Sequence, residues 1–357
     1  MDLAHLPRQL TTLLRERRLR QSQGKADADW QKISSAKVDA LLRRASALDD
    51  DGFYPVLPSA EVKPGAVRAA TIDGIHYVLW RQLSAPWKLL AGPAACPHMG
   101  ADLSDGGWVD GEGRLRCPWH GLALTEGTHP TWTPLPTFDD GTLLWLQPRP
   151  RPSGPQLVTI GRETPGSSER SDNAPSNTTA YVPKVLSYRP SPHVASVVYR
   201  DAHCDPEDII ANRLDPWHGA HFHPHTFTDL EVVSEKAGVL TVKVAFRLLP
   251  GVKVPVVAQF FCCGPRTILM RIVSGEGQGS LVETHAVPLG PGRTRVIEAT
   301  FATSDRPGFH CLRPWMQHAL APLFTKRAER LWQEDCAYAE RRYALRQSGS
   351  IELSKHA

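Results

Sequence analysis

The sequence predicts an α+β protein: a small all-β domain, then a larger antiparallel sheet with a long helix at its C-terminal end. Three observations predict this fold. Short apolar runs punctuated by Gly and Pro begin at Phe53. All periodicity is lost over 148–182, and a stretch rich in Leu, Ala, Arg and Glu runs from about Gly308 to Gln347. A chain of 357 residues can build two or three domains of this kind.

The composition is that of an ordinary globular protein, with 41% hydrophobic and 22% charged residues. No basic stripe interleaved with aromatic residues indicates a nucleic-acid partner, and no apolar stretch is long enough for a transmembrane segment. The seven cysteines are odd in number and irregularly spaced, so they predict free thiols in a reducing compartment, and we expect a cytoplasmic protein. The basic run Arg15–Arg20 is either a solvated helix face or a peripheral contact with a membrane surface or an acidic partner.

The pattern changes divide the chain into five segments. We expect an N-terminal helical segment over 1–51, a β domain over 52–147, a Pro/Ser-rich and partly disordered linker over 148–182, a second domain over 183–347 and a tail over 348–357. In the first domain the strand signals cover 66–70, 75–81 and 89–92, and we expect the domain to close near 143–146.

The second domain reads as an antiparallel meander. After a strand at 194–200 and a helical stretch over 208–218, strand signals follow one another between turn residues at 239–249, 254–263, 267–273, 281–288 and 294–303. A curved sheet closed by the C-terminal helix leaves a cavity suited to an apolar small molecule.

Two short clusters in the first domain carry chemistry. Cys96-Pro97-His98 and Cys117-Pro118-Trp119-His120 supply two thiolates and two imidazoles, with 18 residues between His98 and Cys117. Two cysteines on one iron and two histidines on the other are the ligands of a Rieske [2Fe–2S] centre. The clusters therefore predict an electron-transfer protein.

A second constellation lies in the other domain, where four histidines fall within the eight residues from His218 to His225. A single histidine is more often a hydrogen-bonded residue than a ligand, but four beside Asp215 favour a metal. His218 and His223 can meet at one ion from a helix and its following turn. Two histidines with one carboxylate are the ligands of non-haem Fe(II) oxygenases, whereas a zinc site built from all four histidines is the rival.

Together the motifs resemble the catalytic, alpha-type subunits of Rieske non-haem iron oxygenases. The resemblance covers about 52–147 and 183–347, and it rests on the paired Rieske motifs and on the pattern Asn212-x-x-Asp215-x-x-His218-x4-His223. It implies that the second domain is a helix-grip (START-like) antiparallel sheet with its long C-terminal helix.

By this likeness, His218 and His223 are two iron ligands and a carboxylate of the C-terminal helix is the third. Asp335 is the best match for that carboxylate, and Glu334 is the neighbouring alternative. Asp215 corresponds to the bridge that carries electrons from a Rieske histidine of the adjacent subunit to an iron-ligating histidine. Otherwise it is a helix-capping residue. Asn212 is placed near the iron, or is a plain polar position of a helix.

The resemblance also implies cofactors and partners: one [2Fe–2S] cluster and one Fe(II) per subunit, a separate ferredoxin or reductase that passes on electrons from NAD(P)H, and a head-to-tail homotrimer. The expected reaction is O2-dependent hydroxylation, demethylation or desaturation of an apolar small molecule, isoprenoid or aromatic. The alternative is a Rieske electron carrier fused to a lipid-binding domain without catalytic iron. One departure is Met99, where many relatives carry a basic residue.

Overall fold

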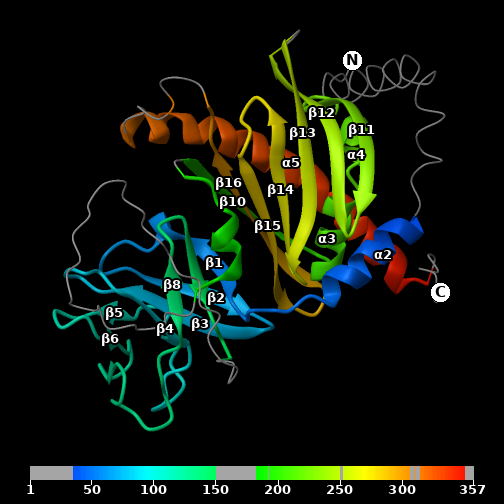
Figure 1. The fold of residues 1–357 in the computed structure, drawn as a ribbon. Helices are drawn as coiled ribbons and strands as arrows, with labels where there is room; N and C mark the ends of the chain where they lie inside the picture. The colour runs from blue at the N-terminus through cyan, green and yellow to red at the C-terminus, as the bar shows by residue number, and fades with distance from the viewer. Residues whose placement is uncertain are drawn as a thin grey trace, which may run out of the picture.

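The computed structural model describes residues 35–149, 182–191, 193–249, 252–305, 309 and 314–349. Within them the chain forms two parts, a small one made of short strands and a large one made of a single long sheet with helices against it (Figure 1). The basic run Arg15–Arg20, nearly all of the expected linker and most of the expected tail lie outside the described residues.

The small part contains three three-stranded antiparallel sheets, with strand orders β1-β9-β8, β2-β3-β4 and β5-β6-β7. The predicted strands at 66–70, 75–81 and 89–92 correspond to β2, β3 and β4, and β9 occupies 143–146, where the domain was expected to close. The strand bounds are β1 (Tyr54–Pro58), β2 (Val67–Ile72), β3 (Ile75–Arg81), β4 (Leu89–Pro93), β5 (Trp108–Val109), β6 (Leu115–Arg116), β7 (Ala123–Leu124), β8 (Thr137–Asp139) and β9 (Leu143–Leu146).

Two tryptophans organise the core of this part. The rings of Trp80 and Trp132 are almost wholly buried, and their centroids lie 6.0 Å apart. Each indole donates to a backbone carbonyl, Trp80 to Gly113 and Trp132 to Pro93, so neither polar atom is left unpaired. Cys96 and Cys117 belong to the same apolar cluster. The two predicted thiolate ligands are therefore anchored in a packed core.

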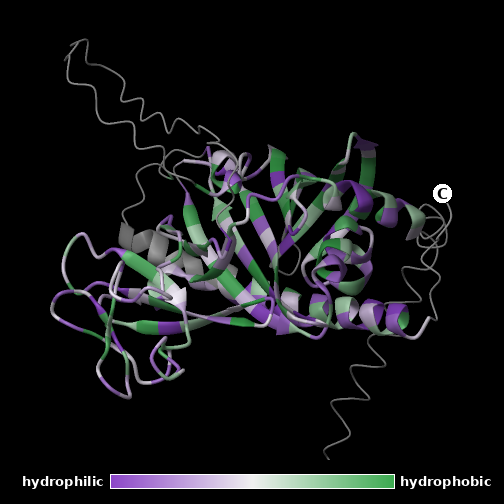
Figure 2. Cartoon of the chain, turned by 90° about the horizontal axis from the view of Figure 1, so that it is seen from below, coloured by the Kyte–Doolittle hydropathy of each residue, from purple (hydrophilic) through white to green (hydrophobic). Residues whose placement is uncertain are grey.

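The large part is a seven-stranded antiparallel sheet in the order β10-β16-β15-β14-β13-β12-β11, which confirms the predicted meander. Apolar and polar bands alternate along its strands (Figure 2), as the two-residue period of a strand requires. The sequence reading missed β11. The strands are β10 (Val194–Ala202), β11 (Phe227–Lys236), β12 (Val239–Leu249), β13 (Val252–Gly264), β14 (Thr267–Gly275), β15 (Leu281–Gly290) and β16 (Arg293–Ala302).

Four helices accompany the sheet: α2 (Ser35–Ser46), α3 (Pro206–Leu214), α4 (His218–Phe222) and α5 (Pro314–Gln347). Helix α5 lies along the sheet and corresponds to the C-terminal helix expected from the sequence (Figure 1). The prediction of one helix over 208–218 was wrong, because the helix ends at Leu214 and a new one begins at His218. Asp215 precedes Pro216, and a residue before proline is disfavoured in the helical conformation.

The two parts share one apolar core, which contains Leu144 and Trp145 from β9 together with Leu269, Leu281 and Phe301 of the large sheet. Strand β15 is consequently buried along most of its length on both faces. A buried ion pair reinforces the contact: Arg189 binds Glu283 of β15 through two bonds of 2.6 and 2.8 Å, and Asp140 of the small part at 2.9 Å. The two parts are thus packed together as one body.

None of the helices in the described residues has the length and apolar character needed to cross a bilayer. Of the described cysteines outside the Rieske motifs, Cys204, Cys263 and Cys336 are buried, as predicted, and Cys262 is partly buried. Burial raises the pKa of Cys263 and that of Cys336 to about 12 each. Cys311 lies outside the described residues.

Candidate redox and metal sites

Two loops of the small part present the Rieske motifs, and they have the same backbone geometry. In each loop a glycine N–H donates back to the carbonyl of the cysteine four residues earlier, Gly100 to Cys96 at 2.8 Å and Gly121 to Cys117 at 2.9 Å. Both glycines have a positive φ, of 78° and 71°, which glycine adopts without steric cost. The repeated geometry places two thiols side by side.

The four predicted cluster residues are brought together by these loops. Cys96 and Cys117 are buried, whereas His98 and His120 are exposed, with ring centroids 4.9 Å apart. Burial and the contact with Cys117 raise the pKa of Cys96. Two buried sulfurs beneath two exposed imidazoles fit a [2Fe–2S] cluster whose histidine side faces solvent.

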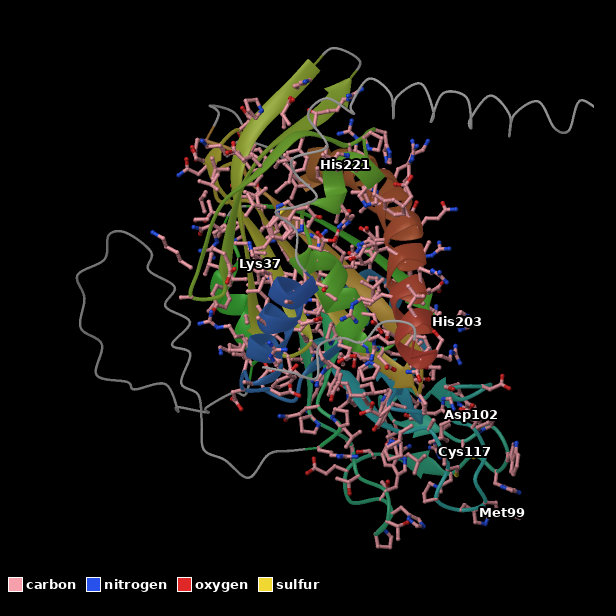
Figure 3. The ribbon with its side chains drawn as sticks, turned by 90° about the vertical axis from the view of Figure 1, so that its right-hand side faces the viewer. Lys37, Met99, Asp102, Cys117, His203 and His221 are labelled. Atoms are coloured by element: carbon pink, nitrogen blue, oxygen red, sulfur yellow. The ribbon has the colours of Figure 1, made fainter. Side chains whose placement is uncertain are left out.

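The surface around the histidines is apolar. Met99 follows His98 and is 64% exposed, and Trp119 precedes His120 and is 60% exposed. Figure 3 shows Met99 and Cys117 at one end of the molecule and His221, on α4, at the other. The Rieske motifs and the second constellation of one chain therefore lie far apart in space.

The break between α3 and α4 builds the second site. Because Pro216 follows it, Asp215 leaves the helical conformation (φ −108°, ψ 76°), and α4 begins only at His218. His223 then follows α4 as its C-terminal capping residue. The x4 spacing thus places two imidazoles on a helix and its following turn, as expected.

His218, His223 and Asp335 converge there, with one ligand atom of each within 4.8 Å of the others. The Oδ1 atom of Asp335, on α5, lies 3.1 Å from His218 Nε2 and 2.8 Å from His223 Nε2. His223 and Asp335 are 1% and 3% exposed. Two imidazole nitrogens and a carboxylate, buried and facing one another, fit a non-haem Fe(II) ion that keeps other positions open.

The electrostatics favour a cation at this point. Burial raises the pKa of Asp335, but the bonds from His218 and His223 outweigh it and hold the pKa well below its usual value. Burial lowers the pKa of His223, and the carboxylates of Asp335 and Glu334 outweigh that effect and raise it. The Asp335 carboxylate thus stays ionised, and its negative charge faces the ring nitrogens of His218 and His223, where a divalent ion would bind.

Glu334, the alternative third ligand, takes a different place. Its Oε2 atom lies 2.6 Å from Nδ1 of His223, the ring nitrogen that faces away from Asp335. Asn212, at 0% exposure, donates from Nδ2 to Asp335 Oδ1 at 3.0 Å, and its own Oδ1 has no hydrogen-bond partner among the described residues. Asp335 and Asn212 are therefore inside the cluster, and Glu334 lies behind His223.

Asp215 contacts the cluster through two of its groups. Its backbone carbonyl accepts a hydrogen bond from His218 Nδ1, and its carboxylate Oδ2 lies 3.9 Å from the same nitrogen. Tyr338 of α5 donates to that Oδ2 at 3.0 Å and stacks on the His218 ring. The sequence reading missed Tyr338. Its position three residues after Asp335, on one face of a helix, is the signal that could have found it.

The remaining histidines do not join the metal ligands. His221 is exposed, and His225 lies 3.6 Å from Glu334. Among the described residues, the group of three possible metal ligands that contains histidines is His218, His223 and Asp335. The rival zinc site built from all four histidines is therefore not formed.

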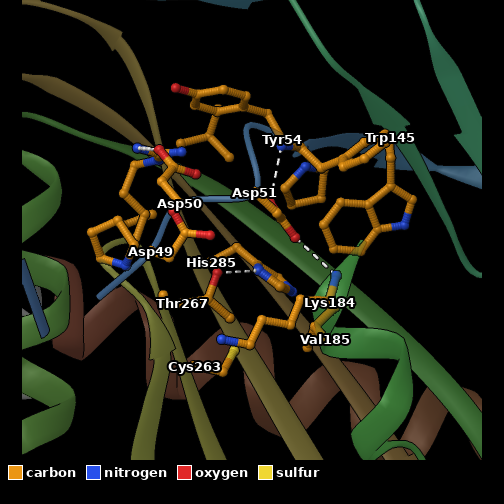
Figure 4. A pocket seen from close by; sticks show the side chains of 17 residues that line it. Asp49, Asp50, Asp51, Tyr54, Trp145, Lys184, Val185, Cys263, Thr267 and His285 are labelled. Atoms are coloured by element: carbon orange, nitrogen blue, oxygen red, sulfur yellow. Dashed lines mark hydrogen bonds and ion pairs between the residues drawn. The ribbon is translucent and has the colours of Figure 1, made fainter. Parts of the chain in front are cut away.

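A pocket of about 470 Å³, partly open to solvent, lies at the junction of the two parts (Figure 4). It is lined by Asp51, Trp145, Arg266, Thr267 and His285, among others. His285 fills its base, with Nδ1 3.0 Å from Thr267 and Nε2 3.3 Å from Glu283. No described residue of α5 lines this pocket, so it is not the cavity expected between the sheet and α5.

Comparison with known families agrees with the division into two parts. Residues 52–138 match the Rieske [2Fe-2S] domain. Residues 174–350 match a family described as a domain of unknown function (DUF5914). The small part therefore matches a Rieske domain, and the match to the second family falls on the large part.

The relatives by sequence share a short stretch with this chain. A protein of Ciona intestinalis named cholesterol 7-desaturase is 33% identical over 96 residues, and one of Xenopus laevis with the same name is 38% identical over 71 residues. These matches cover 25% and 20% of this chain but only 20% and 15% of the relatives, so the chain spans a minor part of their length.

Solved structures match over most of the chain. Dicamba monooxygenase bound to dicamba superposes with a TM-score of 0.54 at 17% identity, covering 86% of this chain and 91% of that one. The terminal oxygenase of carbazole 1,9a-dioxygenase from Novosphingobium sp. KA1 gives 0.51 at 14% identity, covering 95% and 93%. At such identities the likeness shows the fold, which is that of the structures just named.

Proposed function

We propose that this chain, which carries a Rieske domain and has the fold of Rieske oxygenase alpha subunits, is the catalytic subunit of an O2-dependent oxygenase. The observation that carries the proposal is the convergence of His218, His223 and Asp335 in a buried site. An electron carrier needs no second ligand set, whereas an oxygenase needs a metal where electrons, O2 and substrate meet.

In this proposal Cys96 and Cys117 hold one iron of the cluster, and His98 and His120 hold the other. Buried thiols and exposed imidazoles support that division, because electrons then enter and leave on the histidine side. The donor is a ferredoxin or reductase that draws on NAD(P)H. A solved complex of an oxygenase with its ferredoxin, that of carbazole 1,9a-dioxygenase, matches this chain with a TM-score of 0.52.

His218, His223 and Asp335 would hold Fe(II), which supplies O2 activation when it is bound. The chain positions these ligands: the Asp215 carbonyl accepts from His218 Nδ1, so Nε2 of that ring would be the nitrogen that binds the metal, giving up its proton as the metal enters. Asn212 holds the Asp335 carboxylate by donating to its Oδ1. The ligand set is thereby fixed before the metal arrives.

Electrons would reach this site from the Rieske domain of a neighbouring subunit, in a head-to-tail homotrimer. The Rieske motifs and α4 of one chain lie at opposite ends of the molecule (Figures 1 and 3). Asp215 would bridge the two centres, and its Oδ1 is buried without a partner among the described residues, as expected if that partner comes from another chain. A heterologous contact of this kind closes into a ring.

The substrate would be an apolar small molecule, isoprenoid or aromatic. Support comes from the name of the relatives, cholesterol 7-desaturase, and from the solved dicamba and carbazole oxygenases. Hydroxylation, demethylation and desaturation all remain compatible with the ligand set. We place the protein in the cytoplasm, where its thiols stay reduced.

A second candidate is a Rieske carrier fused to a lipid-binding domain without catalytic iron. The pocket at the junction favours it only weakly, because none of the three converging ligands lines this pocket. Iron analysis of the full-length protein separates the two candidates. Three irons per chain support the oxygenase, and two support the carrier.

Turnover of a His218→Ala variant tests the catalytic assignment. With a generic reductase, a panel of sterol and aromatic substrates and labelled O2, the wild type should incorporate label or consume O2 in step with substrate oxidation. The variant should lose product formation and keep the visible spectrum of the cluster. Product formation by the variant at the wild-type rate would refute the assignment.

A further inference from the structure

We infer that Glu334 is a positioning residue that holds His223 with its Nε2 atom toward the metal. His225 lies on the outer side of the contact between Glu334 and His223. The inference rests on the proposed function, because it assigns a role at the same Fe(II) site. It divides the Glu334–Asp335 pair into one carboxylate that meets the metal and one that supports its histidine.

The two carboxylates take opposite nitrogens of a single imidazole. Asp335 Oδ1 lies 2.8 Å from Nε2 of His223, and Glu334 Oε2 lies 2.6 Å from Nδ1. An imidazole that binds a metal through Nε2 must carry its proton on Nδ1. A carboxylate at Nδ1 accepts that proton in a charge-assisted hydrogen bond and so fixes both the tautomer and the ring orientation.

The other histidine has a weaker support. Nδ1 of His218 bonds to the neutral carbonyl of Asp215, while the nearest carboxylate oxygen of that residue is 3.9 Å away. An imidazole whose Nδ1–H donates to a carboxylate is a more basic metal ligand than one whose Nδ1–H donates to a carbonyl. His223 is therefore the more firmly held and more basic of the two nitrogen ligands.

An ordinary surface role does not explain the position of Glu334. Its side chain is 30% exposed, and its Oε1 atom lies 3.6 Å from Nε of Arg330, one helical turn earlier. Such pairs contribute little, and the shorter contact goes through Oε2 to His223, which is 1% exposed. His225, 3.6 Å from the same Oε2, forms the outer side of this contact.

Metal titration tests the inference without relying on turnover. Full-length protein with its cluster intact, freed of mononuclear metal, is titrated anaerobically with Fe(II) and, as a spectroscopic probe, with Co(II). Glu334→Ala should weaken Fe(II) binding about 10- to 100-fold and shift the Co(II) absorption bands. Glu334→Gln should lose only about fivefold, because the amide oxygen still accepts from Nδ1. Glu329→Gln, an exposed glutamate of the same helix, is the control and should match the wild type.

The two proposals fail in different ways. If His218→Ala and Asp335→Ala bind Fe(II) as tightly as the wild type, the metal site itself is wrong. If those variants lose the metal while Glu334→Ala and Glu334→Gln keep wild-type affinity and Co(II) bands, only the role of Glu334 is overturned. The glutamine variant preserves shape, so it decides the question even if the alanine variant does not fold.

Discussion

Asp215 makes contacts at the site that the sequence alone does not reveal. Its carbonyl orients His218, and its carboxylate receives a hydrogen bond from Tyr338 at 3.0 Å. Burial and the charge of Asp215 raise the pKa of Tyr338 well above its usual value, so the phenol stays protonated and acts as a donor. Tyr338 thereby keeps one carboxylate oxygen occupied and leaves the other for a partner.

We expect Tyr338→Phe to slow electron delivery to the metal site. Losing the donor leaves a nearly buried carboxylate oxygen unpaired, and substitutions of groups that support metal ligands lower activity about 10-fold or more. Stopped-flow reoxidation of the reduced cluster with substrate and O2 measures the effect. Tyr199→Phe, which removes a hydroxyl 3.4 Å from Glu61, is the control. Reoxidation of the Tyr338 variant at the wild-type rate would contradict this role.

At this scale the sequence predicts residue types better than it predicts their contacts. The spacing of His218 and His223 places them near one another because it involves only local structure. Glu334 and Asp335 are adjacent, so no spacing argument says which of them meets Nε2 and which meets Nδ1. That choice depends on the rotation of α5 about its axis, which packing against α3 and β10 fixes.

Among the elements, the strand β5 and the turn before it hold the two Rieske loops together. A Cβ atom on Gly107 would lie 2.2 Å from the backbone oxygen of Leu103 and 3.3 Å from that of Arg116. Both oxygens belong to the backbone and cannot rotate away. This turn therefore requires glycine for space, independently of its φ angle.

Gly107→Ala should consequently lower cluster incorporation. Overpacking of this kind typically costs about 1–3 kcal/mol, and the strain falls between the loops of Cys96 and Cys117. Iron content per chain and visible absorbance measure the loss. Gly111→Ala is the matched control, since its Cβ would meet nothing within 4 Å. Full incorporation in the Gly107 variant would show that the turn relaxes freely.

The elements themselves could largely be predicted where their patterns were local. The strands of the meander and the long helix follow from periodicity and turn residues. The break between α3 and α4 carried a signal in Pro216, and the general tendency of the residue before proline would have found it. The strand β11 escaped because Val233 lies on its exposed face and Ser234 on its more buried face, which interrupts the apolar alternation.

For the whole molecule, the buried charges at the junction hold the Rieske domain on the sheet. Glu283 is 0% exposed, and its partners Arg189 and His285 are also buried. Burial raises the pKa of Glu283, but its bonds with His285 and Arg189 outweigh this and lower it below 4.5. The residues of the Arg189–Glu283 pair are 94 positions apart in sequence, so no local pattern could predict this contact.

Glu283→Gln should destabilise the protein by about 3 kcal/mol at pH 7, because it breaks a buried pair and leaves Arg189 with Asp140 alone. Since the folded-state pKa of Glu283 is lowered, its charge stabilises the fold above pH 4.5, and this contribution is lost as the pH falls below that value. The difference between wild type and variant in urea unfolding should shrink on acidification. Glu235→Gln, exposed on the same sheet, is the control. A difference independent of pH would contradict this assignment.

The shared core and the ion pairs of Arg189 with Glu283 and Asp140 also bear on how turnover depends on protein concentration. Under the proposed function, a Rieske domain packed this firmly on its own sheet would not reach the metal site of its own chain, and each chain would need a neighbour that binds by mass action. Turnover per chain should therefore fall steeply on dilution through the range in which sedimentation shows the subunits separating, and adding back a chain that has an intact Rieske domain but carries His218→Ala should restore it. Constant turnover per chain across that range would mean that one molecule is sufficient by itself.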